Sequence, residues 1–76
     1  MATLYKTDGT QRVIETLRSF TLEEVQALIG GYVEAYPHAK GYILCDEEGL
    51  LKGKPANPYF PQLVGDVLCV TRKEFK

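Results

Sequence analysis

Residue types that bind metals or act as catalytic nucleophiles are scarce in this sequence. Histidine occurs once, at His38, and tryptophan is absent. The two cysteines, Cys45 and Cys69, stand in apolar runs, and there is no CxxC motif. Cysteine in such runs behaves as a small buried hydrophobe, and apolar surroundings raise the pKa of its thiol. We therefore expect reduced core thiols, with a disulfide or a metal ligand as the alternatives, and no metal site, cofactor or catalytic residue.

Strong charge of one sign and long apolar runs are also missing. The formal net charge is −1, so the global basic field that is typical of nucleic-acid binders is absent. No apolar run is long enough for a signal peptide or a membrane span. These absences predict a cytoplasmic protein with neither a membrane partner nor a generic nucleic-acid partner.

The length of 76 residues leaves room for a single domain, residues 1–76, with a small core. A domain of this size buries only roughly 60% of the surface that its unfolded chain exposes. Disulfides, metals or oligomerisation usually supplement so small a core. Because the sequence offers little for the first two, we expect a homo-oligomer.

One helix is strongly indicated, over about Thr21–Ile29. Thr21 and Glu24 have the spacing of a capping box, in which each side chain bonds the other residue's backbone N–H. Gly30 follows the helix and suits the left-handed conformation that ends helices. Apolar residues recur at helical spacing along one side: Leu22, Val25, Leu28 and Ile29. This pattern predicts an amphipathic helix with one face in the core.

Several further segments carry strand-like patterns of apolar residues. They are Leu4–Lys6, Thr10–Leu17, Tyr32–Tyr36, Tyr42–Cys45 and Val67–Thr71, with Leu50–Lys52 as a further short candidate. The nearly continuous apolarity of Val67–Thr71 is typical of a central strand. Together these segments predict an α+β fold, in which the helix packs on a mostly antiparallel sheet of four to five strands.

Turns are expected at three places. The Asp8-Gly9 dipeptide suits a two-residue hairpin turn. Residues 46–49 read as a solvated acidic turn with its glycine at positive φ, since their spacing is not that of a calcium loop. Prolines make residues 53–61 a structured loop rather than a strand.

The Tyr32–Tyr36 strand, which Pro37 is expected to end, provides the first candidate binding site. Tyr32, Glu34 and Tyr36 project together at a period of two. Tyrosine combines apolar area with a hydroxyl and is enriched at interfaces. We expect either an oligomer or ligand surface here or ordinary, half-exposed sheet aromatics.

The loop after residue 51 provides the second candidate site. Lys52, Lys54, Asn57 and Tyr59 combine two cations, an amide and an aromatic ring. Such a set could bind an anionic nucleotide by charge and stacking. The alternative is a proline-pinned loop whose lysines are ordinary surface residues and whose Phe60 packs into the core.

Four separated segments resemble the motifs of a known family. They are the helix-to-strand join 22–34, the turn 46–49, the loop 53–57 and the segment 64–68. They resemble the domain of unknown function 3846, in which a leucine-rich helix runs into "GGYIE", as in 22–34, followed by an "NEEG" turn, as in 46–49, and by "GLPLN", as in 53–57. Asp46 departs from the family's usual Asn, and Lys54 and Ala56 replace apolar residues.

The resemblance implies a phage, plasmid or bacterial setting, with location in the host cytoplasm if a phage encodes the chain, and no assigned activity. Small phage proteins often act by occupying a host molecule. The leading hypothesis is a non-enzymatic binding module that serves counter-defence by sequestering a nucleotide signal at a subunit interface. The alternative hypothesis is a protein-binding inhibitor or adaptor of a host enzyme.

Overall fold

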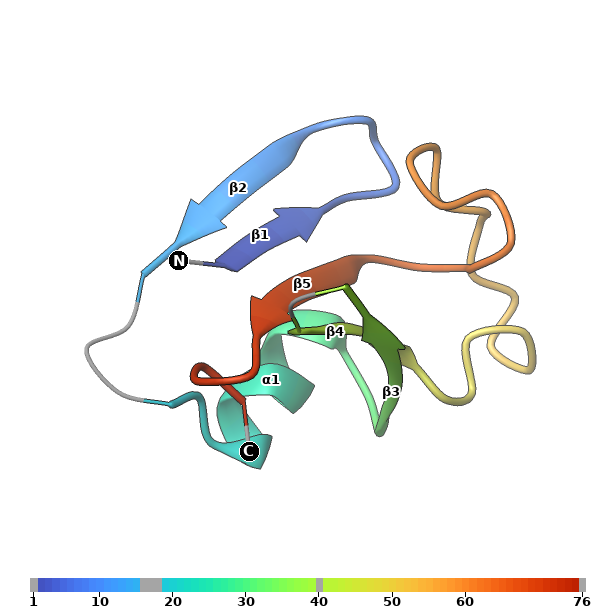
Figure 1. Ribbon diagram of the computed structural model, residues 1–76. Helices are drawn as coiled ribbons and strands as arrows, with labels where there is room; N and C mark the ends of the chain where they lie inside the picture. The colour runs from blue at the N-terminus through green and yellow to red at the C-terminus, as the bar shows by residue number, and fades with distance from the viewer. Residues whose placement is uncertain (1, 16–18, 40, 76) are drawn as a thin grey trace.

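The computed structural model describes residues 2–15, 19–39 and 41–75, which form one sheet and one helix (Figure 1). The elements in chain order are β1 (Ala2–Tyr5), β2 (Gln11–Ile14), α1 (Leu22–Ile29), β3 (Val33–His38), β4 (Gly41–Asp46) and β5 (Val67–Thr71). The strands are arranged in the order β2-β1-β5-β4-β3, and each neighbouring pair is antiparallel. The predicted α+β class is confirmed, with five strands in the sheet.

Helix α1 has the ends that the sequence predicts. The Thr21 hydroxyl accepts a hydrogen bond from the Glu24 N–H, at 3.1 Å, and the Glu24 carboxylate accepts one from the Thr21 N–H, at 2.9 Å. Gly30 ends the helix in the left-handed conformation, with φ at 89°. The predicted apolar stripe is wrong at Leu22, which is 52% exposed because it lies in the first turn, at the margin of the helix–sheet contact.

The main core lies between α1 and one face of the sheet. Its buried members come from both layers: Ala2, Leu4, Phe20, Val25, Ile29, Leu44, Leu68 and Val70. Strand β5 lies between β1 and β4, so the predicted central position of Val67–Thr71 is confirmed. Among the described residues, no helix has the length and apolar character that crossing a membrane requires.

The β1–β2 hairpin differs from its prediction. The Lys6 N–H donates to the Thr10 carbonyl at 2.9 Å, and the Gly9 N–H donates to the Lys6 carbonyl at 3.1 Å. This is a three-residue loop, with Gly9 at a φ of 89°, rather than a two-residue turn. The predicted Thr10–Leu17 strand is confirmed only for Gln11–Ile14, and its positions 16 and 17 lie outside the described residues.

Pro37 lies inside β3 and does not end it, which contradicts the prediction. The Glu47 N–H donates to the Tyr32 carbonyl at 2.8 Å, and β3 pairs with β4 so that Pro37 stands opposite Tyr42. Along an antiparallel pair only every second residue bonds the neighbouring strand, so, starting from Tyr32, the backbone of Pro37 is directed away from β4. An edge strand tolerates proline there because no ladder hydrogen bond is lost.

The long segment between β4 and β5 forms no strand of the sheet. Leu50–Lys52, predicted as a short strand, lies in a turn. The predicted loop at 53–61 is confirmed, and its one ladder-like contact is an isolated bridge between Ala56 and Val64. In Figure 1 this segment, drawn in yellow to orange, lies at the end of the sheet remote from the C-terminus.

Candidate binding site

The face of the sheet opposite α1, here called the open face, carries a second and smaller core. Ile43, Cys45 and Val67 are its buried members, and Phe60 and Leu63 pack against them. The loop that contains Phe60 and Leu63 therefore covers part of the open face, and the rest of this face has no helix over it (Figure 1).

Two hollows adjoin each other on the open face. The first has a volume of about 390 Å³ and is lined by Tyr36, Ile43, Gln62 and Leu63. The second, of about 350 Å³, has among its lining residues His38 and Cys69. Ile43 and Cys69 stand opposite each other across β4 and β5, which makes the two hollows neighbours.

Tyr36 stands beside the first hollow and is 41% exposed. Its hydroxyl donates a hydrogen bond of 2.7 Å to a carboxylate oxygen of Glu34. This bond, followed by slight desolvation and the negative charge of Glu34, raises the pKa of the Tyr36 hydroxyl. Tyr32, the third member of the predicted site, precedes β3 and is 66% exposed. Glu34 and Tyr36 are thus joined directly, whereas in the described part of the chain no hydrogen bond links Tyr32 to either of them.

Lys52 and Lys54, predicted as ligand-binding cations, both contact Asp46. Their ammonium nitrogens lie 2.9 Å and 2.7 Å from the same carboxylate oxygen. Lys54 also donates to the carbonyl of Ile29 and Lys52 to that of Gly30, at 3.1 Å and 3.3 Å. Cations at these orphan carbonyls stabilise a helix, because the end of the helix is negative. Anion binding by these lysines stays a prediction, but both have an internal role.

The Asp46 side chain is fully buried, so the prediction of a solvated acidic turn is wrong at this residue. Burial disfavours its charge, but hydrogen bonds from Lys54, Lys52 and the Glu48 N–H outweigh this effect and lower its pKa to about 2. Gly49 is buried and is not among the described glycines with positive φ, which corrects the second part of that prediction. Glu47 alone of the three acids is exposed.

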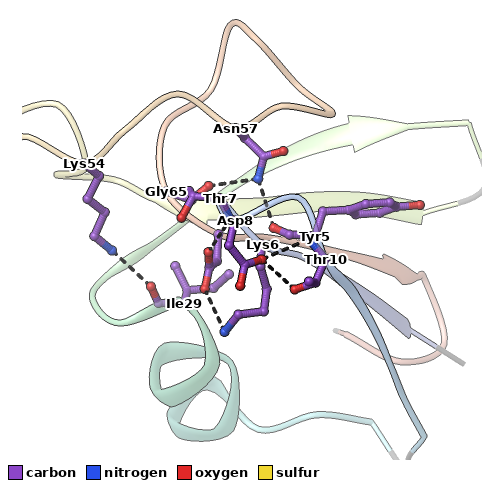
Figure 2. A network of polar contacts seen from close by, with 10 residues as sticks. Tyr5, Lys6, Thr7, Asp8, Thr10, Ile29, Lys54, Asn57 and Gly65 are labelled. Carbon is purple, nitrogen blue, oxygen red and sulfur yellow. Dashed lines mark hydrogen bonds and ion pairs between the residues drawn. The ribbon is translucent and has the colours of Figure 1, made fainter.

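Asn57 and Tyr59 also make internal contacts, of which Figure 2 shows those that the Asn57 amide nitrogen donates. The Asn57 amide is buried and donates to the carbonyls of Tyr5 and Gly65, at 2.9 Å and 3.0 Å. Its oxygen accepts from the Tyr59 N–H at 2.9 Å. The Tyr59 hydroxyl donates to the Gly9 carbonyl, and its ring lies 5.0 Å from that of Tyr5. These contacts fasten the loop to the β1–β2 hairpin.

Both thiols are free, as predicted. Burial raises the pKa of Cys69, and burial followed by the charges of Glu34 and Asp46 raises that of Cys45. Neither thiol is therefore activated as a nucleophile. In the part of the chain that the structure describes, no group of three or more His, Cys, Asp or Glu side chains is arranged to hold a metal ion.

The sequence matches the model of a known protein family. The model of a domain of unknown function, DUF3846, matches residues 1–75. The chain belongs to the DUF3846 family. No curated protein and no solved structure matches it.

Three of the residues that line the first hollow of this DUF3846 domain were not predicted from the sequence. Ile43 is signalled by alternation with Leu44, since one of two neighbours in a strand must face away from the helix. Gln62 and Leu63 carry no such signal, because a loop without periodicity does not reveal which face it covers.

Proposed function

We propose that this DUF3846 domain is a non-enzymatic binding module that docks a protein partner on its open face. The single observation that carries the proposal is the hollow of about 390 Å³ beside Tyr36, which combines a half-exposed aromatic ring with apolar walls from Ile43 and Leu63. Concave apolar sites with a few polar groups are typical of binding sites, and tyrosine is enriched at interfaces.

The contacts of the predicted nucleotide-binding residues favour a protein partner over the nucleotide signal of the leading hypothesis. Lys52 and Lys54 are held at Asp46 and at the end of α1, and Asn57 is buried. An anionic ligand would have to break these contacts to use the loop. The proposal therefore takes up the alternative hypothesis, an inhibitor or adaptor that binds a host enzyme, with self-association as a separate prediction.

Affinity capture from a bacterial lysate with three forms of the domain tests the proposal. The wild-type protein and Leu51→Ala are expected to retain the same partner, because Leu51 is 86% exposed and lines no described hollow. Tyr36→Ala is expected to lose that partner by tenfold or more, as interface tyrosines often do. Equal capture by all three forms contradicts the proposal.

A thermal-shift screen of cyclic and linear nucleotides separates the two hypotheses. No shift is expected if the partner is a protein. Stabilisation by about 2.7 kcal/mol at a hundredfold excess over Kd would instead support nucleotide sequestration. Light scattering at high micromolar concentration tests self-association independently, and a clean monomer there contradicts the predicted homo-oligomer.

A further inference from the structure

The region around Tyr36 is acidic as well as apolar. A smaller hollow of about 110 Å³ adjoins the first one, sharing Tyr36, Gln62 and Leu63 with it. Glu34 and Glu47 are acidic members of its lining, and no Lys or Arg lines either hollow among the residues that the structure describes. Asp46 lines it too, but its side chain is fully buried and its charge is met by Lys52 and Lys54. Among the described residues, Glu34 and Glu47 form no ion pair.

Apolar side chains stand next to these acids. Leu50 lines the smaller hollow and is 82% exposed, and Leu63 lies between the two hollows. Exposed leucine beside a half-exposed tyrosine is a feature of docking surfaces, provided that it forms a patch rather than single scattered residues. Leu50, Tyr36 and Leu63 all line the smaller hollow, so these apolar groups adjoin one another rather than stand scattered; this surface, with Glu34 and Glu47, is here called the patch.

We infer that this patch binds a basic segment of a partner protein, in which a Lys or Arg side chain stands next to an apolar anchor. The inference rests on the proposed function and names the class of partner. An arginine over the patch could hydrogen-bond the Glu34 carboxylate and lie against the Tyr36 ring. The adjoining hollow of about 390 Å³ takes the apolar anchor, and Glu47 attracts further basic residues.

Two observations support a cationic protein partner over the other occupants. The carboxylates of Glu34 and Glu47 form no ion pair among the described residues; burial is the main cause of the raised pKa of Cys45, and the nearby charge of Glu34 raises it further. A second copy of the chain, docked by the same patch about a two-fold axis, would bring Glu34 and Glu47 against their equivalents. Like charges facing each other in this way disfavour that assembly.

Selection of peptides from a random 12-residue display library on the immobilised domain tests the inference. The enriched peptides are expected to combine Lys or Arg with a neighbouring aromatic or aliphatic residue. Their affinity should fall about tenfold in the Glu34→Gln, Glu47→Gln double variant and should weaken as salt concentration rises. The matched control is Glu15→Gln, Glu23→Gln, which removes the same charge from exposed positions outside the patch and should leave the affinity unchanged.

The outcomes separate this inference from the proposed function. Enriched peptides that are acidic or uncharged, yet lost in Tyr36→Ala, overturn the basic class of partner and leave the open face as the binding site. Basic peptides that bind the patch variant and the control variant equally also overturn it, because general charge attraction would explain them. Displacement of the peptides by spermidine at equal affinity would assign the patch to a free polycation instead, and a library with no specific peptide contradicts the inference outright.

Discussion

The Asp46 carboxylate connects the end of β4 and the loop that follows it to the end of α1. It contacts Lys52 and Lys54 directly, and through them it holds the carbonyls of Ile29 and Gly30 at the end of α1. Because the carboxylate is buried and both lysines are partly exposed, loss of Asp46 leaves cations that can turn to water. The contacts therefore stabilise this junction, and removal of Asp46 leaves no buried charge without a partner.

We predict that Asp46→Ala lowers the free energy of unfolding at pH 7 by about 2 kcal/mol, the value of charge-assisted hydrogen bonds. The folded-state pKa of Asp46, about 2, lies below its ordinary value of 3.8. Its contribution is therefore complete above that ordinary value and is lost as the pH falls toward 2. Urea unfolding at pH 7 and at pH 2.5 measures both effects. Glu47→Ala is the control, and an equal difference between Asp46→Ala and wild type at the two pH values contradicts the prediction.

The roles of Lys52, Lys54 and Asn57 show where sequence reasoning stops at this scale. Their residue types suggested recognition of a nucleotide, but each of them also bonds a backbone carbonyl that lies 22 to 52 positions away. No local pattern encodes such pairs. Asp46 and Lys54 are both departures from the motifs that the sequence resembles, and the two residues contact each other at 2.7 Å.

At the scale of elements, α1 is determined by signals that lie within ten residues of one another. The capping box and the Gly30 cap follow from residue type and spacing, so the sequence alone predicted both ends. Strand β3 was harder to predict. A proline such as Pro37 is tolerated inside a strand only where no neighbouring strand would accept a hydrogen bond from its missing N–H. Only the position of β3 at the edge of the sheet decides this, and that position depends on the whole topology.

We predict that Thr21→Ala destabilises the domain by about 1 kcal/mol, because the N–H of Glu24 loses its acceptor at the start of α1. Thr21→Ser, which keeps the hydroxyl, should restore most of this loss. Thermal unfolding followed by circular dichroism measures the difference. If serine and alanine prove equally destabilising, the hydroxyl is not what stabilises the cap.

For the whole molecule, one sheet supplies both cores, and Leu68 and Val67 in the central strand point to opposite sides of it. The larger core was predictable from the amphipathic helix and the apolar runs. Of the loop residues in the smaller core only Phe60 was predicted, whereas the packing of Leu63 depends on the loop folding back over the open face. That return fixes the hollow beside Tyr36, which explains why the sequence identified the tyrosine but not its surroundings.

We predict that Leu68→Ala costs about 3 kcal/mol, since a fully buried leucine would leave a cavity between α1 and the sheet. A chain of this length has a total stability of only about 4 to 11 kcal/mol, so this loss removes a large part of it. Leu51→Ala, at an exposed position, should change stability by less than about 0.5 kcal/mol. Urea midpoints measure both variants, and equal midpoints contradict the assignment of Leu68 to the core.

The free thiol of Cys69 has a practical consequence, because it lines the hollow next to the one beside Tyr36 and is only partly buried. Cys45, two residues along β4 from Ile43, is buried beneath the same face. Alkylation kinetics should therefore have a slow phase from Cys69 and a slower one from Cys45. The two native cysteines thus form a built-in footprinting pair, in which the faster rate reports how often the open face is covered and the slower rate how often the sheet opens.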